Sequence, residues 1–374
     1  MSRRLLLLTI ALLMFPQLAQ TLYSPALADL AKRFSLPPSA ASQAMSLYLF
    51  GFAAGVLLWG RLADRLGRRP ALLCGLGVFA VAALGGLMAG SFGQVLLAQA
   101  LAAVGAAAAS VVTQTVLRDH LRGPALAQAF SWIGMALALS PAIGLALGTL
   151  LVAAHGYVGV QSGLLLIAAL LAVACLAGLR ESRPAEIPHT PMLPLLRQLL
   201  RDRWIWSHAL LVMAFNVAMY SWYVLGPFVF ARLHWPATWF GASGAVLALG
   251  SALGAWGNGR LLRAGVATTT RIRIAAGLVL TGGLAALLHD HPAVVAAMVP
   301  VVTGFGLAIP NVLGQALRGY PHCLGSAGAL FGLLYYLLIG AAMALVGAVQ
   351  LLAPTLIVCG LLALWLQRQR PVTA

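Results

Sequence analysis

Acidic side chains are the scarcest feature of this sequence. Only 7 of its 374 residues are Asp or Glu, against 23 Lys and Arg, and 8% of the chain is charged. Soluble domains carry roughly 25% charged residues, so this composition excludes a soluble domain. With 61% hydrophobic residues and a mean hydropathy of +0.95, the chain is predicted to be an all-α polytopic membrane protein.

Several signatures of chemistry are also missing. No GxxxxGK[ST] phosphate loop occurs, which excludes a pump driven by ATP on its own. Paired acids, a histidine cluster or a Cys/His pair at membrane depth are absent as well, so we expect no enzyme, no catalytic residue and no cofactor. The cysteines lie in or beside apolar segments without CxxC spacing, so neither a disulfide framework nor a metal site is predicted. They are Cys74, Cys175, Cys323 and Cys359.

Long apolar runs are what the chain has in place of charge. Hydropathy gives about twelve segments long enough to cross a bilayer, six on each side of one polar stretch. This layout predicts a six-helix bundle at 1–179, a cytoplasmic linker at 180–206 and a second bundle at 207–374. A weak internal repeat supports the plan, because Gly60-Arg61-Leu62 and Gly259-Arg260-Leu261 each close the second segment of their half.

Arginine is distributed unevenly over the connecting loops. If the loop at 60–70 is cytoplasmic, most other arginines share its side, whereas the opposite side keeps only Lys32, Arg33 and Arg232. The asymmetry predicts that both termini face the cytoplasm. We therefore interpret the net charge of +16 as a topology signal and expect a lipid bilayer, not nucleic acid, as the partner.

The loop at 60–70 carries the most specific motif. It has the pattern Gly-x-x-x-Asp-Arg-x-Gly-Arg-Arg and resembles the loop 2–3 signature of the major facilitator superfamily. The stretches 22–27, 48–59 and 311–318 resemble the bicyclomycin/chloramphenicol-resistance group of drug:proton antiporters within it. The resemblance implies the major facilitator fold and a monomeric secondary transporter of the inner membrane. It also implies alternating-access efflux of drug-like or small metabolite substrates, coupled to protons.

The charged loop is expected to act as a conformational latch. A glycine lets helices approach closely, an acid can lie at a helix N-terminus, and the arginines can pair with it. The resemblance implies that the loop's neighbour is the eleventh segment in the outward-closed state. Such a contact is made in one state and broken in the other. The alternative is a loop that only sets topology. The latch residues are Gly60, Asp64, Arg65, Gly67, Arg68 and Arg69.

The fifth segment contains a second pattern, Ser-Pro-Ala-Ile-Gly at 140–144, which resembles the antiporter signature of drug exporters. Gly144 and Gly148 lie four residues apart on one helix face and permit close packing. Pro141 removes a backbone donor and can bend the helix. We predict a gate-forming helix from these three residues, with tight packing without gating as the alternative.

Neutral polar side chains recur at helical spacing on four segments that line the central cavity of the resembling fold. Interhelical hydrogen bonding is the alternative reading for each one. Together they predict a substrate cavity suited to an uncharged or zwitterionic amphiphile. The cavity residues are Gln17, Gln20, Thr21, Gln99, Ser110, Thr113, Asn216, Tyr220, Tyr223, Asn311 and Gln315.

Proton coupling is the point at which the residues depart from the family pattern. The family places an acid where Thr21 stands and an arginine where Gln99 stands, and all seven acids here fall in loops or at helix ends. Membrane-embedded ionisable groups are the usual proton carriers, and the nearest candidates are Asp29, Asp119 and His208. A dedicated carrier of a nucleoside, sugar or siderophore, with altered or no proton coupling, therefore stays open, as does a receptor without turnover.

Overall fold

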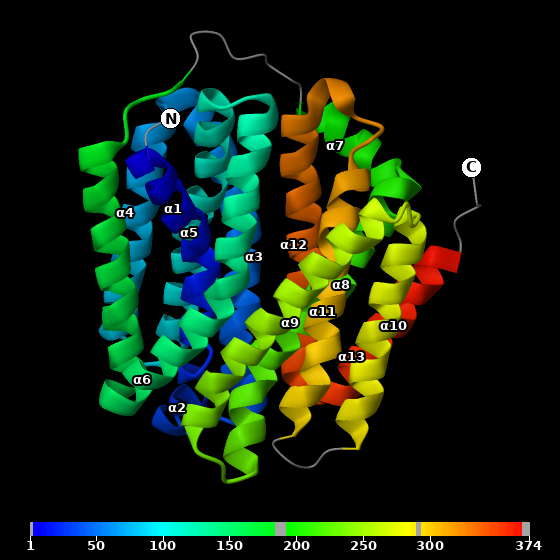
Figure 1. The fold of residues 1–374 in the computed structure, drawn as a ribbon. Helices are drawn as coiled ribbons and strands as arrows, with labels where there is room; N and C mark the ends of the chain where they lie inside the picture. The colour runs from blue at the N-terminus through cyan, green and yellow to red at the C-terminus, as the bar shows by residue number, and fades with distance from the viewer. Residues whose placement is uncertain (1–2, 184–191, 289–292, 369–374) are drawn as a thin grey trace. The chain divides into compact units, whose positions relative to one another are not determined.

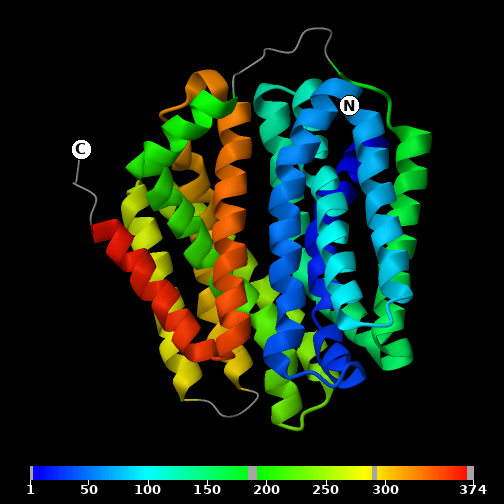
Figure 2. The same ribbon diagram turned by 180° about the vertical axis from the view of Figure 1, so that it is seen from behind.

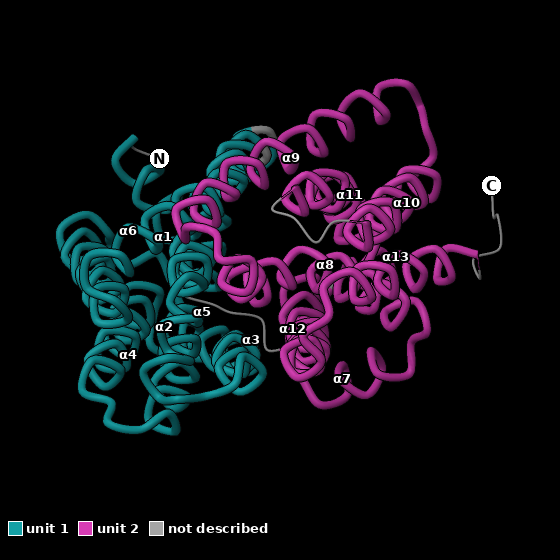
Figure 3. Tube along the Cα trace, turned by 90° about the horizontal axis from the view of Figure 1, so that it is seen from below, with its two compact units in different colours: residues 1–189 teal, residues 190–374 magenta. Residues whose placement is uncertain are grey.

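Helices make up all the regular structure in the part of the chain described here. A computed structural model describes residues 3–183, 192–288 and 293–368. The chain divides into two compact units, Met1–His189 and Thr190–Ala374 (Figure 3). The dividing point falls inside the stretch 180–206, whose bounds as a linker stay a prediction. The all-α class expected from composition is confirmed.

Unit 1 contains six helical elements, coloured blue to green in Figures 1 and 2. The last of them, α6, is two helices in sequence, because the backbone leaves the helical region at His155 and Gly156. A Cβ added to Gly159 would lie 2.5 Å from the Leu151 carbonyl oxygen, so the two arms fold back on each other. The elements are α1 (Arg3–Tyr23), α2 (Ala26–Arg33), α3 (Pro38–Leu66), α4 (Arg68–Leu87), α5 (Phe92–His120) and α6 (Gly123–Gly178).

Unit 2 also consists of long helices, with one short helix before the first of them and another between the fourth and fifth. Its long helices begin with α8, whose N-cap Asp202 accepts a hydrogen bond from the backbone N–H of Trp204 at 2.8 Å. The elements are α7 (Met192–Arg201), α8 (Arg203–Arg232), α9 (Ala237–Arg263), α10 (Thr268–Leu287), α11 (Val294–Ala316), η1 (Pro321–Cys323), α12 (Leu324–Val349) and α13 (Leu352–Arg368).

The lengths of these helices match a bilayer. Ten helices have at least 18 residues and are apolar enough to cross a membrane. Because α6 has two arms and α13 is a further apolar helix of 17 residues, the described chain supplies the twelve segments expected from hydropathy. The chain is therefore a multi-pass membrane protein. Large apolar side chains inside these helices are exposed, such as Leu150 of α6 at 63%, as expected of a surface that faces lipid instead of water.

Small residues allow the helices inside each unit to pack closely. In unit 1, a Cβ on Gly105 of α5 would lie 2.6 Å from the carbonyl oxygen of Gly75 of α4. In unit 2, α11 packs against both α9 and α10. Helices in lipid associate through van der Waals contact, and short side chains bring the backbones together. These contacts hold the polar side chains described below in fixed positions.

Two short helices lie outside the segments predicted from hydropathy. The first, α2, follows α1 at the end of the first span. The second, α7, lies within the polar stretch, buries Leu195 and Leu199 and exposes Arg197 and Arg201. At ten residues α7 is too short to span a bilayer. Its basic residues and single apolar face are instead typical of a helix that lies at the membrane–water interface.

Candidate functional site: a charged cluster and a tyrosine cluster

The chain reverses sharply between α3 and α4. The first helix ends at Leu66, Gly67 has a φ of 103°, and the second helix begins at Arg68. A φ in this region favours glycine because a Cβ would be strained there. The tight reversal places the side chain of Asp64, in the last turn of α3, beside that of Arg68 in the first turn of α4.

Arg68 is the buried centre of this loop. Its Nε donates to Asp119 of α5 at 3.0 Å, and its Nη1 donates to Asp64 at 3.1 Å and to the Ala63 carbonyl at 2.9 Å. The Arg68 side chain is 4% exposed and that of Asp119 15%, whereas that of Asp64 is 49% exposed. A guanidinium shared between two carboxylates binds three segments of unit 1 together. Of the two ion pairs, the one with Asp119 is better shielded from water.

Glu181 completes the cluster, although the sequence motif does not include it. Its carboxylate accepts hydrogen bonds from the backbone N–H groups of Arg68 at 2.8 Å and Arg69 at 3.1 Å. An acid at a helix N-terminus is stabilised by these donors and by the helix dipole. A Cβ on Gly67 would lie 2.5 Å from Glu181 Oε2, so the glycine also makes room for the acid.

The donors around Glu181 determine its ionisation. Partial burial raises the pKa of the carboxyl, but backbone N–H groups of Arg68, Arg183, Arg69 and Ser182 lower it further than burial raises it. The net result is a pKa below the ordinary value of 4.5. Glu181 is therefore a charged cap that fastens the end of α6 to the start of α4.

The other latch residues occupy the outside of this cluster. Arg69 donates through Nη2 to the Leu176 carbonyl of α6 at 2.9 Å. Arg65 is exposed, and its carbonyl accepts from Arg183 Nη1 at 2.9 Å. Within unit 1, a Cβ on Gly60 would meet only Val111 Cγ1, at 4.0 Å. The structure thus brings together five of the six predicted residues, and Gly60 lies one turn before Asp64 on α3.

The predicted gate residues form the contact between α6 and α1. A Cβ on Gly144 would collide with the side chain of Thr21, and one on Gly148 with the backbone of Leu22. Pro141 is buried, and the non-helical dihedral angles of α6 lie at the turn between its arms rather than at this proline. The close packing proposed from the sequence pattern is present, and gating stays a prediction.

The polar side chains predicted on the first and fourth spans are mostly buried inside unit 1. Thr21 donates to the Gln17 carbonyl at 2.9 Å, and Gln114 donates to Ser110 Oγ at 3.5 Å. Thr113 is fully buried, and its hydroxyl has no partner among the described residues. Gln17 and Ser110 are half-buried, while Gln20, Thr21 and Gln99 are buried.

Two of the predicted residues of α8, Tyr220 and Tyr223, lie beside aromatic rings of α12, since Tyr220 is close enough to Tyr335 to interact with it electrostatically. Tyr220 and Tyr223 have ring centroids 5.9 Å apart. On α12, which packs against α8, the rings of Tyr335 and Tyr336 lie 4.6 Å apart, and Phe331 is 5.4 Å from Tyr335. These five rings are called the tyrosine cluster below. Its α12 members have no counterpart in the polar stripes predicted from the sequence. The sequence feature that could have indicated them is the adjacent pair Tyr335-Tyr336 within an apolar run.

The remaining predicted residues of unit 2 are Asn216, in the middle of α8, and Asn311 and Gln315, in the last two turns of α11. Asn216 is buried one turn before Tyr220 and donates to the Val212 carbonyl at 2.8 Å. Asn311 donates to Asn258 Oδ1 at 2.7 Å. Gln315 is half-buried, and its carbonyl accepts from Trp204 Nε1 at 3.1 Å.

The three titratable groups considered for proton transfer all have structural contacts. Asp29 accepts from the backbone N–H of Tyr157 at 2.7 Å and so caps the second arm of α6. Asp119 pairs with Arg68. His208 is fully buried, its Nδ1 lies 2.8 Å from the Trp204 carbonyl, and its ring packs 4.3 Å from that of Trp204. No group of three or more metal-ligating side chains occurs among the described residues.

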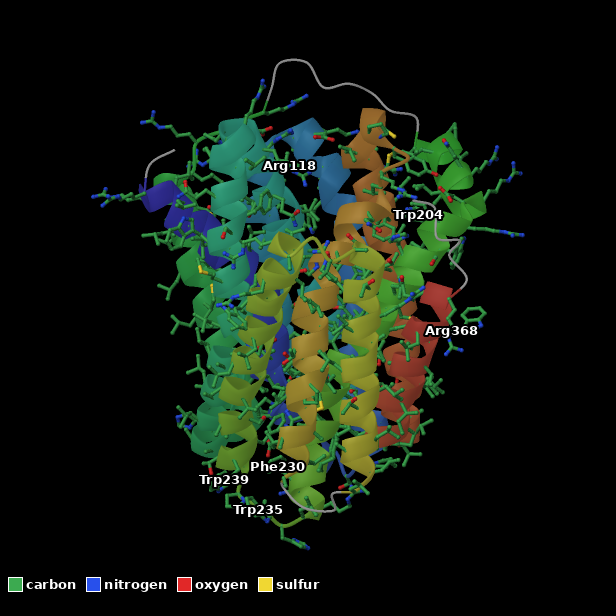
Figure 4. The ribbon with its side chains drawn as sticks, turned by 45° about the vertical axis from the view of Figure 1, so that its right-hand side comes forward. Arg118, Trp204, Phe230, Trp235, Trp239 and Arg368 are labelled. Atoms are coloured by element: carbon green, nitrogen blue, oxygen red, sulfur yellow. The ribbon has the colours of Figure 1, made fainter. Side chains whose placement is uncertain are left out.

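The two ends of unit 2 differ in character. Trp204 lies at one end, beneath the Arg318 guanidinium at 3.8 Å. A cavity of about 580 Å³ at this end is lined by residues of α7 together with Asp202 and Tyr320. At the other end, aromatic side chains line an apolar pocket of about 360 Å³ (Figure 4). Its aromatic members are Phe230, Trp235 and Trp239. Tryptophans at this level are typical of a membrane–water interface.

Comparisons with known proteins identify the architecture. A family model described as the Major Facilitator Superfamily matches residues 9–345. The crystal structure of a D-xylose-proton symporter superposes with a TM-score of 0.76 at 13% identity, covering 98% of this chain and 96% of that one. At this identity the symporter is informative about the fold alone.

Curated relatives are more similar in sequence. An uncharacterized transporter of Rickettsia bellii (strain RML369-C) is 27% identical over 346 residues, 88% of this chain and 86% of the relative. Multidrug resistance protein D of Escherichia coli (strain K12) is 30% identical over 189 residues, 50% of this chain and 48% of that protein. A chloramphenicol resistance protein of Pseudomonas aeruginosa is 35% identical over 134 residues, 36% of this chain and 32% of that protein.

Proposed function

The chain belongs to the major facilitator superfamily, and from this premise we propose that it exports drug-like or small metabolite amphiphiles across the inner membrane by alternating access. It is a membrane transporter and not an enzyme, as the family and fold establish. The direction of transport and the class of substrate are the proposed part. Relatives named for multidrug and chloramphenicol resistance support them.

The tyrosine cluster carries the proposal. It combines five aromatic rings with the neighbouring amide of Asn216, and the described spans contain no acid away from their ends. Aromatic rings offer a large apolar area with polar tips, which suits an amphiphilic molecule. A strongly cationic substrate would gain more from a buried carboxylate, so the cluster favours an uncharged or zwitterionic compound.

The charged cluster at Arg68 supplies a two-state element of the kind that alternating access needs. Glu181 fastens the start of α4, and Asp119 holds the buried guanidinium. Asp64 is the more exposed of the two acids paired with Arg68, so it is the member that can exchange partners between states. Such an exchange is what a conformational latch requires.

The contacts of the three titratable candidates support transport without protons. Asp29 and Asp119 are engaged in helix capping and ion pairing, and His208 is packed against Trp204. We propose that export is driven by the outward gradient of a compound accumulated in the cell or by exchange for another solute, rather than by a proton gradient. A dedicated carrier for one metabolite shares this prediction and differs only in the breadth of its substrates.

Counterflow in proteoliposomes tests the proposal. A panel of labelled uncharged, zwitterionic and cationic solutes, which includes nucleosides and sugars, is exchanged with and without an imposed pH gradient. We expect exchange of neutral amphiphiles at a rate that the gradient leaves unchanged. Several accepted solutes support export of diverse compounds, and a single one supports a dedicated carrier. Strong acceleration by the gradient contradicts uncoupled transport, and no exchange of any solute favours a receptor.

A variant in the tyrosine cluster links this activity to the site. Tyr220→Ala should raise the KM for neutral amphiphiles, because it removes an aromatic surface that the substrate would contact. Tyr320→Phe, outside the cluster and beside Asp202, is the matched control and should keep the wild-type KM. An unchanged KM in Tyr220→Ala would place the substrate elsewhere.

A further inference from the structure

Unit 2 contains a buried arginine that has no carboxylate partner in the described part of the chain. Arg271, in the first turn of α10, is 5% exposed. Its Nη1 donates to Asn258 Oδ1 at 3.0 Å and its Nη2 donates to Thr268 Oγ1 at 2.8 Å. Its Nε is buried and has no hydrogen-bond partner among the residues that the structure describes. Both acceptors that the described residues place on this guanidinium are therefore neutral.

Arg68 of unit 1, by comparison, has the carboxylate partners that Arg271 lacks among the described residues. Arg68 is the first residue of α4 and Arg271 the fourth of α10, so both lie in the first turn of their helix, but Arg68 has carboxylates of Asp64 and Asp119 on its guanidinium. In the internal repeat, the fourth residue after the shared glycine is Asp64 in unit 1 and Arg263 in unit 2. The acid of the first half is thus replaced by a second cation.

The helix ends differ in the same way. Glu181 caps α4, whereas the N-cap residue of α10 is Ala267, whose side chain has no acceptor to cap the helix. In the described part of unit 2 the one acid is Asp202, which is occupied by the start of α8 and by Tyr320. Asn258 Oδ1 is also shared, because it accepts from Asn311 at 2.7 Å.

A buried charge is unfavourable unless an opposite charge compensates it. The start of α10 offers backbone N–H groups and the positive end of a helix dipole, which bind phosphate readily. Thr268 and Thr269 are half-buried and Thr270 is exposed, so this turn can be reached from outside. Because α10 is a membrane span, its end lies at the depth of lipid headgroups.

We propose that the first turn of α10 binds a phosphate group, which serves as the counter-ion of Arg271. The N–H groups and hydroxyls of 268–270 contact the phosphate, and the guanidinium supports it through Thr268. The group is carried by an anionic phospholipid or is free phosphate. The site is separate from the tyrosine cluster and does not depend on the proposed substrate.

Asn258→Asp gives the sharpest test, because it supplies the missing carboxylate from within the protein. The full chain is reconstituted in nanodiscs of phosphatidylcholine, to which either phosphatidylglycerol or, separately, inorganic phosphate is added at constant ionic strength. We expect the wild-type Tm to rise by about 2 °C or more with one of the two additions. A rise with phosphatidylglycerol alone identifies a lipid, and a rise with inorganic phosphate identifies a free anion.

The variants decide whether the effect belongs to Arg271. Asn258→Asp should have the higher Tm in phosphatidylcholine and lose the response to the added anion, and Arg271→Gln should also lose the response. Arg3→Gln, at an exposed arginine of unit 1, should keep it. The proposal is overturned if the wild type responds to neither addition, or if Asn258→Asp responds as strongly as the wild type.

Discussion

At the scale of single residues, the two acids on Arg68 are predicted to have different tasks. Asp119→Asn should lower the free energy of unfolding by about 1.5–3 kcal/mol, because it removes a charge-assisted hydrogen bond from a buried guanidinium. Asp64→Asn should lower it by less than about 1 kcal/mol, because Asp64 is half-exposed. Thermal unfolding followed by tryptophan fluorescence measures both. Equal losses of unfolding free energy in the two variants would contradict the prediction that Asp119 is the more stabilising partner of Arg68.

Transport should rank the same two variants differently. If Asp64 is the exchanging member of the latch, Asp64→Asn loses most counterflow while its expression and Tm stay near those of the wild type. The reason is that the two conformations no longer differ in the contacts of this carboxylate. Unchanged counterflow in Asp64→Asn would leave the loop at 60–70 with a role in topology alone.

Glu181 predicts a pH-dependent contribution to stability. Its pKa in the folded protein is lower than the ordinary 4.5, so the folded state favours the charged form. Its contribution is fully present above the unfolded pKa and is lost as pH falls through the folded pKa. The wild type should therefore exceed Glu181→Gln in Tm near neutral pH, and the difference should close below about pH 4.5. Tm curves that stay parallel across this range would contradict the charged cap.

The sequence motif pointed to this cluster but could not complete it. The pattern from Gly60 to Arg69 identifies the loop because its residues are adjacent in the chain. Glu181 lies more than a hundred residues from Arg68, and nothing in local spacing indicates which acid caps which helix. Asn258 and Arg271 were missed for the same reason, since their partnership depends on how α9, α10 and α11 pack.

At the scale of helices, the contact between α1 and α6 makes a prediction about packing. Gly144→Ala and Gly148→Ala should each cost about 1–3 kcal/mol, because the added methyl overpacks a close helix contact. The clash at Gly144 is with the side chain of Thr21, so Thr21→Ala should restore part of the loss in a double mutant. The clash at Gly148 is with the backbone of Leu22, and the same change should not restore it.

Gly134, on the same arm of α6, is the matched control. A Cβ there would meet nothing within 4 Å, so Gly134→Ala should keep the wild-type stability. Thermal unfolding of the single and double variants measures the coupling. If Gly134→Ala is as costly as Gly144→Ala, the effect belongs to helix flexibility rather than to the contact with α1.

Hydropathy is sufficient to find the membrane spans in the sequence, but it does not show which helix faces pack against each other. A run of about twenty apolar residues is needed to cross a bilayer, so the segments could be found one at a time. The short helices α2 and α7 and the fold-back of α6 depend instead on tertiary packing and on the backbone at Gly156. The pair Tyr335-Tyr336 lies on a span outside the four polar stripes, and its place beside Tyr220 depends on how α12 packs against α8.

At the scale of the whole molecule, the arginine distribution predicts the orientation in the membrane. The positive-inside rule places the loop at 60–70, the linker and both termini in the cytoplasm. Green fluorescent protein fused after the C-terminus should therefore fluoresce, and alkaline phosphatase fused there should be inactive. Fusions in the connection between α8 and α9, which carries few basic residues, should give the opposite pair of signals.

Exchanging basic residues between loops on opposite sides of the membrane tests whether arginine determines the orientation. If arginine sets the orientation, replacing Arg61, Arg65 and Arg69 with glutamine while adding lysines near Pro236 should weaken the preference, because the charge difference between the two sides falls. Arg68 stays unchanged in this variant, since it is buried and paired. A mixed population of the two fusion signals is expected. An orientation unaffected by the exchange would show that the charged loop is retained for its contacts within unit 1 and that another part of the chain determines topology.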